Sequence, residues 1–251
     1  VQYGEWLARP QPEPVRFSDV DGDRGASIIA HALSRGNTWL DPEEVRALLQ
    51  CYGIAMLEQR VTNSPSEAAA VAAEWRRPVA LKAIAPSLLH KSDAGGVLLN
   101  LKSDDVQGAA QDMEQRLRAG GHSPVRFLIQ PMAQPGAEML IGMVQDPRFG
   151  PLVACGAGGV AVELLKDVAV RLAPLSLQDA QEMLQELKTF PLLHGYRGAP
   201  PKDTNALIDI LLRVGQLAED AVQVVEMDLN PVLVHESGAS VVDARIRIAL
   251  S

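Results

Sequence analysis

The chain has 251 residues, of which 47% are hydrophobic and 22% are charged, and its formal net charge is −8. This length suits one large or two modest domains with buried cores, and the negative charge argues against nucleic-acid binding, which needs a basic surface. No apolar run approaches the roughly 18 residues of a membrane span, and the only cysteines, Cys51 and Cys155, are expected as reduced core thiols of a cytoplasmic protein.

The first 39 residues are predicted as a linker and a connector helix. Residues 1–22 are polar and rich in proline, which is typical of a linker or an extended edge, and a short helix is expected over 23–35. The next helix has favourable start chemistry, because Asp41 is a suitable N-cap and Pro42 occupies the first helical position.

Strands and helices alternate over the rest of the chain. The first part, residues 57–131, predicts strands at 57–62, 78–84, 96–101 and 125–131 and helices at 65–75 and 104–119. The second predicts a strand at 137–144, an apolar glycine-containing segment at 151–165, helices at 176–188 and 203–218, and consecutive strands over 222–250. This mixture, ending in a hairpin, indicates an α+β fold in two lobes rather than a regular doubly wound sheet.

Polar side chains alternate along the first strand of the closing hairpin. Glu226, Asp228 and Asn230 are two residues apart, so on a strand they share one face. Carboxylate and amide oxygens are hard ligands that suit Mg²⁺. The alternative is a plain polar outer face on an edge hairpin, and the pattern alone favours that alternative slightly.

The expected turn sets the partner of this strand. A two-residue turn at Ser237-Gly238 pairs Asn230 with Arg245 and Val232 with Asp243. Asp243 is then a diagonal neighbour of Asn230 on the same face, roughly 7–8 Å away. A turn longer by one residue would move Asp243 to the opposite face.

Lys82 stands inside an apolar segment, 79-VALKAI-84. A buried ammonium group is costly without an anionic partner, which favours a lysine directed at a phosphate. A lysine on an edge strand that points to solvent explains the segment equally well.

The segment 88-LLHKSDAGGVLLN-100 follows this strand. Gly95 and Gly96 allow backbone amides to approach an anion, and His90 and Lys91 add charge. The segment lacks the P-loop pattern, and the glycines of 156-GAGG-159 lack the spacing of a dinucleotide fingerprint. The residues alone leave a phosphate site and a simple turn as alternatives.

Together these segments resemble an ATP-grasp domain of the kind found in NDP-forming acyl-CoA synthetases and, more distantly, the β subunit of succinyl-CoA synthetase. The resemblance is carried, in order, by 40–54, 78–101, 129–151, 156–175, 192–203 and 224–246. It implies a two-lobed ATP-grasp fold with a nucleotide cleft between the lobes. The implied divisions are a linker and connector at 1–39, one lobe from 40–57 plus 129–251, and a mobile lobe from 58–128.

The resemblance also implies a site that binds ATP or ADP with Mg²⁺. The implied nucleotide-binding residues are Lys82 at the phosphates, Gly95 and Gly96 in a phosphate-covering loop, Gln130 and Met132 in a hinge strand against adenine, and Glu138 near the ribose. The implied Mg²⁺ ligands are Asn230 and Asp243, with Asp228 beside them.

The resemblance implies a ligase activity that needs a CoA-binding partner, upstream in the same chain or separate, which would also hold the small carboxylic acid. A histidine of that partner carries phosphate, and His90, aided by Lys91, is expected to pass phosphate to it. One alternative is a silent regulatory domain fused to a GNAT-type lysine acetyltransferase. A second is a carboxylate–amine ligase, which the 90–97 and 195–203 segments disfavour.

Overall fold

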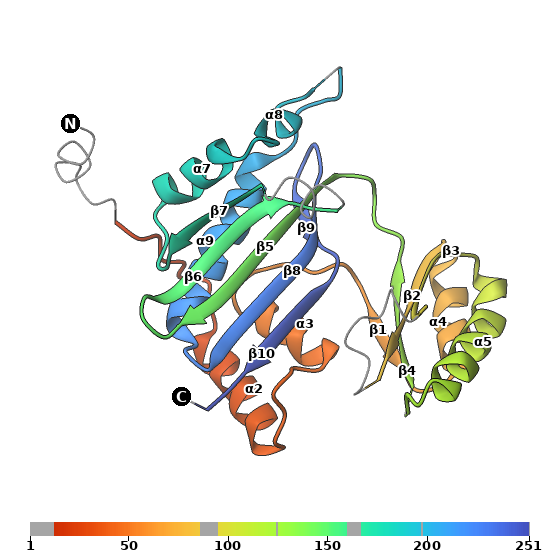
Figure 1. The fold of residues 1–251 in the computed structure, drawn as a ribbon. Coiled ribbons are helices and arrows are strands. Elements are labelled where there is room, and N and C mark those ends of the chain that lie inside the picture. Colours follow the sequence, from red (N-terminus) through yellow and green to blue (C-terminus); the bar gives the residue numbers. More distant parts are fainter. Residues whose placement is uncertain (1–12, 86–94, 124, 160–166, 197, 251) are drawn as a thin grey trace. The chain divides into compact units, whose positions relative to one another are not determined.

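The computed structural model describes residues 13–85, 95–123, 125–159, 167–196 and 198–250. These residues form two compact units, a larger one up to Met56 and from Pro135 onward, and a smaller one from Leu57 to Gln134 (Figure 1). Within the described ranges, no helix is both long and apolar enough to cross a membrane. Each unit is built around its own sheet and hydrophobic core.

The smaller unit has a four-stranded sheet in the order β1-β4-β2-β3. Its strands are β1 (Arg60–Thr62), β2 (Val79–Ile84), β3 (Val97–Leu101) and β4 (Arg126–Pro131), and its helices are α4 (Pro65–Trp75), the short 3₁₀ helix η1 (Ser103–Asp105) and α5 (Val106–Ala119). Helices α4 and α5 lie along one face of this sheet (Figure 1). In the strand order β2 lies between β4 and β3, so it is an interior strand.

The two faces of β2 differ in character. Val79, Leu81 and Ala83 join the core that the helices cover. Because side chains alternate across a strand, Ala80 and Lys82 belong to the opposite face. This alternation places a lysine on the sheet face away from the helices.

The larger unit has a six-stranded antiparallel sheet in the order β10-β8-β5-β6-β7, with β9 paired to β8. Its strands are β5 (Ala137–Asp146), β6 (Gly150–Ala157), β7 (Val168–Leu172), β8 (Val224–Val234), β9 (Ala239–Val241) and β10 (Ala244–Ile248). Its helices are α2 (Gly22–Ser34), α3 (Pro42–Cys51), α7 (Leu177–Glu186), α8 (Phe190–Leu193) and α9 (Thr204–Asp220).

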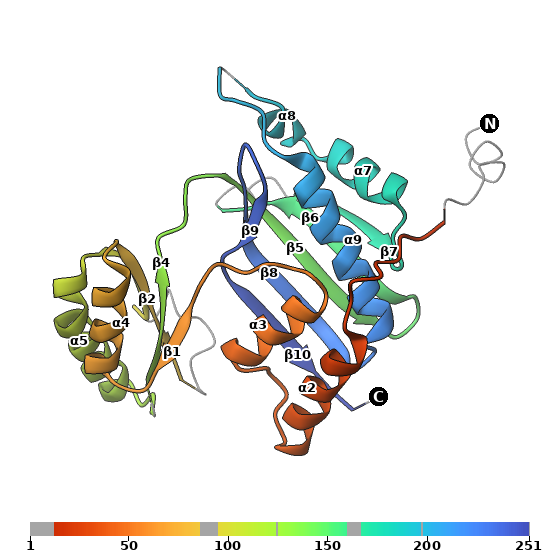
Figure 2. The same cartoon turned by 180° about the vertical axis from the view of Figure 1, so that it is seen from behind.

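Helices α2, α3, α7 and α9 lie on one side of this sheet (Figure 2). Met227 and Leu229 of β8 and Ile246 and Ile248 of β10 point into the core beneath them. The alternate residues of β8 and β10 therefore lie on the face without helices, where polar side chains gather.

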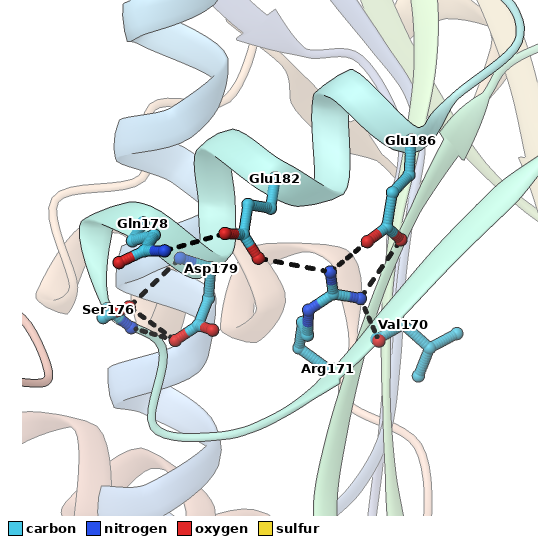
Figure 3. A network of polar contacts seen from close by, with 7 residues as sticks. All are labelled: Val170, Arg171, Ser176, Gln178, Asp179, Glu182 and Glu186. Atoms are coloured by element: carbon cyan, nitrogen blue, oxygen red, sulfur yellow. Dashed lines mark hydrogen bonds and ion pairs between the residues drawn. The ribbon is translucent and has the colours of Figure 1, made fainter. Parts of the chain in front are cut away.

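A polar network joins the edge strand β7 to α7 (Figure 3). Arg171 pairs with Glu186 and lies 3.8 Å from Glu182, both on α7. Ser176 and Asp179 form a capping box at the start of this helix, with the Ser176 hydroxyl donating to the carboxylate at 2.6 Å. These contacts fix the orientation of α7 against the sheet edge.

The segment before α2 packs along α9 (Figure 2). The backbone N–H of Phe17 donates to the side chain of Gln216 at 2.8 Å, and Arg213 forms an ion pair with Asp19 at 3.1 Å. Arg213 also lies 4.0 Å over the ring of Phe17. Of the two interpretations of the N-terminal stretch, the extended edge describes these residues better than a free linker.

Most predicted elements are present, with bounds that differ by a few residues. The prediction of two reduced core thiols is confirmed, because Cys51 and Cys155 are free and buried. The sequence does not predict β7, whose Val168, Val170 and Leu172 alternate with Ala169 and Arg171, nor the one-turn helix α8.

Candidate functional site

Asn230 and Asp243 face each other across β8 and the residue that precedes β10. The backbone N–H of Asn230 donates to the Asp243 carbonyl at 3.0 Å. Asn230 is exposed and Asp243 is half-buried, and both positions belong to the face without helices. The structure therefore brings together two of the three predicted metal ligands.

The predicted hairpin register is wrong by two residues. β8 and β9 pair Val232 with Val241, and β8 and β10 pair Asp228 with Arg245. Asp243 lies directly opposite Asn230 instead of diagonal to it. Because the shift is an even number of residues, each side chain keeps its predicted face.

Asp203, the N-cap of α9, explains the register. Its backbone N–H donates to the His235 carbonyl at 2.8 Å, and its carboxylate accepts from the Gly238 N–H at 2.8 Å. These bonds replace the second hydrogen bond that a simple turn would form between His235 and Gly238. They also hold the pKa of Asp203 below its ordinary value, chiefly through the Gly238 and Ala206 amides. Sequence reasoning missed this role, although an Asp just before a helix is a typical N-cap.

Asp228, the third predicted ligand, lies opposite Arg245 in the strand register rather than opposite Asp243. Burial raises the pKa of Asp228 above its ordinary value, the charge of Arg245 opposes this rise, and the charges of Asp243 and Glu226 add to it. Asp228 is thus close enough to Asp243 to feel its charge, which agrees with a place beside the pair.

The donor chemistry of the pair fits Mg²⁺. An amide oxygen and a carboxylate are hard ligands, and an ion held by two protein groups keeps positions for phosphate and water. One Asp243 oxygen accepts the Ala244 N–H at 3.0 Å, which orients the carboxylate. Within the described ranges, no three His, Cys, Asp or Glu side chains are placed to hold a metal. These residues therefore do not form a site that would bind a metal through three such side chains.

Lys82 is 7% exposed on the interior strand β2. The alternative of a solvent-facing lysine on an edge strand is therefore wrong. Its cross-strand neighbours are Val97 and Leu128. Lys82 is thus a buried charged residue with apolar neighbours on both adjacent strands.

Gly95 and Gly96 directly precede β3. Gly95 has φ +66°, a conformation that favours glycine, and the Gly96 carbonyl accepts the Ala83 N–H at 2.7 Å. Arg116 of α5 lies against Gly95, where an added Cβ would be 3.1 Å from its guanidinium. The predicted phosphate carriers, His90 and Lys91, lie outside the described residues.

Gln130 and Met132 stand at and just beyond the end of β4. The Gln130 side-chain amide donates to Gln59 at 2.9 Å, and both residues are buried. The Met132 N–H donates to the Pro78 carbonyl at 2.9 Å, and its sulfur accepts the Asn100 N–H at 3.4 Å. Gln130 and Met132, the two predicted hinge residues, are thus held by hydrogen bonds within the smaller unit.

Glu138, predicted near the ribose, is exposed on β5. Its carbonyl accepts the Gly158 N–H at 2.7 Å, and a Cβ on Gly158 would lie 2.8 Å from its backbone. A Cβ on Gly159 would lie 2.7 Å from its carboxylate. Gly158 and Gly159 therefore allow close packing against Glu138, whereas Gly156 packs against Asp167 and Val168.

Comparison with known proteins decides the family. A family model described as an ATP-grasp domain matches residues 31–248. The chain belongs to the ATP-grasp family. Its predicted ATP-grasp fold is confirmed.

The relatives of this ATP-grasp domain include ADP-forming ligases. The β subunit of ADP-forming acetate–CoA ligase II from Pyrococcus furiosus is 40% identical over 225 residues, which cover 87% of this chain and 95% of that subunit. The ADP-forming acetate–CoA ligase I of Archaeoglobus fulgidus is 40% identical over 231 residues. These cover 90% of this chain but 33% of the ligase, so the ATP-grasp domain spans about a third of that relative.

Solved structures agree with this kinship. Acetyl-coenzyme A synthetase 1 of Candidatus Korarchaeum cryptofilum, in complex with coenzyme A and Ca-AMPCP, matches with a TM-score of 0.85 at 38% identity over 90% of this chain and 100% of that chain. The same synthetase with coenzyme A and Mg-AMPPCP, its phosphohistidine segment pointing towards the nucleotide-binding site, matches with a TM-score of 0.78. None of these names mentions an acetyltransferase.

Proposed function

We propose that this ATP-grasp domain is the nucleotide-binding half of an ADP-forming acyl-CoA synthetase. The Asn230–Asp243 pair carries the proposal, because two hard oxygen donors face each other on the helix-free sheet face. The β-subunit relative and the synthetase solved with Mg-AMPPCP support it.

The proposed nucleotide-binding residues have separate roles. Lys82, with Gly95 and Gly96, binds the phosphates, Gln130 and Met132 contact adenine, and Glu138 contacts the ribose. Asn230 and Asp243, with Asp228 beside them, would hold Mg²⁺. The bound ion would neutralise phosphate charge and orient the phosphate chain.

The proposed chemistry is a relay of one phosphoryl group. A neutral imidazole nitrogen of His90 attacks the γ-phosphorus, the bond to the β-phosphate oxygen breaks, and ADP leaves. The group then passes to a histidine of a CoA-binding partner and next to a carboxylate, which gives an acyl phosphate. The CoA thiolate attacks its carbonyl carbon and releases inorganic phosphate. Lys91 and Lys82 would stabilise the charge on the transferring group.

Calorimetry and labelling test this proposal. The full chain should bind Mg-ATP, and with its CoA-binding partner it should form ADP over many turnovers only when a carboxylic acid and CoA are both present, because without them ADP formation stops once the histidines are phosphorylated. With ATP labelled at the γ-phosphate, the wild-type chain should acquire an acid-labile, base-stable phosphate, and His90→Ala should not. An absence of Mg-ATP binding would contradict nucleotide binding, and a His90→Ala chain that is still labelled would contradict the relay.

The same assays separate the alternative of a silent regulatory domain attached to an acetyltransferase. That alternative expects nucleotide binding without any acid- and CoA-dependent formation of ADP. The relatives named as ligases support the synthetase instead.

We also propose a cytoplasmic location. The two buried free thiols, Cys51 and Cys155, support it, because a reducing compartment preserves thiols. Fractionation of cells that express the full-length protein would test this location.

A further inference from the structure

Two arginines of β10 share the helix-free sheet face. Arg245 lies opposite Asp228 and Arg247 lies opposite Glu226 on β8. Each is thus placed across from one carboxylate, on the same strand and the same face. Their side-chain contacts differ, because Arg247 contacts Glu226 and Arg245 contacts an aromatic ring.

Arg247 is engaged by its cross-strand partner. Its Nε donates to a Glu226 carboxylate oxygen at 2.9 Å. Both side chains are more than two-fifths exposed, which is typical of a surface ion pair that contributes little stability. The ion pair with Glu226 is therefore sufficient to explain the position of the Arg247 side chain.

Arg245 is held by an aromatic ring instead. Its guanidinium carbon lies 5.2 Å from the ring centroid of Trp39. Among the described residues, no carboxylate forms an ion pair with Arg245, although Asp228 is its cross-strand partner. Because a cation–π contact rests on the attraction between the charge and the ring rather than on hydrogen bonds to oxygen, the Arg245 N–H groups can still donate to an anion.

Trp39 is itself fixed to the strand that carries Arg245. Its neighbour Leu40 donates a backbone N–H to Ile246 at 3.0 Å, and Ile248 donates one to Thr38 at 2.8 Å. The segment around Trp39 thus extends the sheet beside β10. This pairing places Trp39 directly opposite Arg247, and its indole lies diagonally beside the Arg245 guanidinium.

Arg245 also lies close to the proposed Mg²⁺ ligands. It is two residues beyond Asp243 on the same face, and Asp243 lies opposite Asn230. A phosphate chain attached to an ion at this pair would pass over the same face. A planar guanidinium with several N–H donors can bind two phosphate oxygens at once.

We propose that Arg245 is a phosphate-binding residue of the nucleotide site and that Trp39 positions its guanidinium for that contact. The proposal rests on the proposed function, because it takes the phosphate chain of a nucleoside triphosphate as the ligand. Arg245 adds a fixed positive charge beside the ion and stabilises the phosphates as charge moves during transfer. The competing explanation is that Arg245 only offsets the charge of Asp228.

Calorimetry with Mg-ATP and with adenosine tests the proposal on the full chain. Arg245→Met should weaken Mg-ATP binding by about tenfold or more, as expected for lost charge-assisted hydrogen bonds, and leave adenosine binding nearly unchanged. Arg247→Met is the matched control, with the same charge change on the same strand and face, and should stay within about twofold of wild type. Arg245→Lys should recover part of the affinity.

Trp39→Leu separates positioning from packing. It should weaken Mg-ATP binding by several-fold, and it should have little further effect when Arg245 is already Met, because the two residues act through one contact. Should Arg245→Met fail to fold, Arg245→Lys and Trp39→Leu carry the same test. Equal affinities of the Arg245→Met and Arg247→Met chains overturn the role of Arg245 while the proposed function stands. A wild-type chain that binds no Mg-ATP overturns both.

Discussion

Asn230 and Asp243 lie directly opposite each other, joined by a 3.0 Å hydrogen bond from the Asn230 N–H to the Asp243 carbonyl. The bond uses backbone atoms, so it positions the two side chains without consuming the Asn230 amide oxygen. The pair combines one charged and one neutral oxygen ligand. This geometry makes the contribution of Asp243 to Mg²⁺ binding directly testable.

Asp243→Asn keeps the side-chain shape and removes one negative charge. We expect the affinity for ATP at millimolar Mg²⁺ to fall about tenfold, because a carboxylate ligand is lost, while binding without Mg²⁺ changes little. Titration calorimetry at several Mg²⁺ concentrations measures this. Glu226→Gln, on the same face of β8, is the control and should keep the wild-type Mg²⁺ dependence. An Asp243→Asn chain with that same dependence would exclude Asp243 as a ligand.

Lys82 supplies a second test, in the smaller unit. Lys82→Met keeps much of the buried stem and removes the charge, so we expect Mg-ATP binding to weaken by about tenfold or more while the chain still folds. Lys102→Met, at an exposed position after β3, should bind as wild type does. Urea denaturation of both variants checks the folding. If the two variants bind alike, Lys82 does not contact the phosphates.

The hairpin shows what sequence patterns can determine. Alternation along β8 correctly places Asp228 and Asn230 on one face, because Met227 and Leu229 are apolar enough to fix which face is buried. The turn rule gives the wrong register, because Asp203 of α9 bonds to both His235 and Gly238. That contact spans more than thirty residues of sequence and has no local signal.

Lys82 and β7 show two other limits. The pattern around Lys82 cannot tell an edge strand from an interior one, because strand order depends on pairing with β3 and β4. β7 is short and starts next to Asp167, in a stretch with few turn residues, so alternation over five positions is too weak to be recognised. The long amphipathic helices, by contrast, were predictable from their periodicity and caps.

Asp167 anchors the start of α8 and gives a stability prediction. Its carboxylate accepts the backbone N–H groups of Lys188 and Thr189, each at 2.8 Å, and the Thr189 hydroxyl at 2.6 Å. Asp167→Ala should lower the free energy of unfolding by about 2 kcal/mol at pH 7, because the three donors lose a charged acceptor. Asp167→Asn keeps one acceptor oxygen and should lose less. Urea denaturation measures both.

The same carboxylate gives a pH dependence. Burial favours protonation of Asp167, but its hydrogen bonds and the charge of Lys188 hold its pKa below the ordinary value. The unfolded chain therefore binds the proton more readily, so the stabilisation is present above the unfolded pKa of about 3.9 and is lost as the pH falls through the lower folded value. The difference between wild type and Asp167→Ala should shrink from neutral pH towards pH 3. A difference that stays constant with pH would contradict the assignment.

The two cysteines should be unreactive in the folded chain. Burial raises the pKa of Cys155 to about 12 and also raises the pKa of Cys51, so neither is a thiolate near pH 8. We expect a thiol reagent to modify neither residue quickly in buffer and both in concentrated urea. Rapid modification of one thiol in buffer would show that its surroundings open far more readily than the packed core implies.

Arg213 should hold the N-terminal segment onto the larger unit. Its guanidinium bonds Asp19, Asp209 at 2.8 Å and the Tyr52 carbonyl at 3.0 Å, and its side chain is 11% exposed. Arg213→Met should cost about 1–2 kcal/mol of unfolding free energy and increase hydrogen exchange over residues 15–21, since the Tyr52 carbonyl and two partly exposed carboxylates lose a largely buried donor. Arg16→Met removes an exposed arginine from the same segment, whose ion pairs are solvated, and should cost less than about 1 kcal/mol. Equal costs for the two variants, with unchanged exchange over 15–21, would show that the segment is held by its apolar contacts alone.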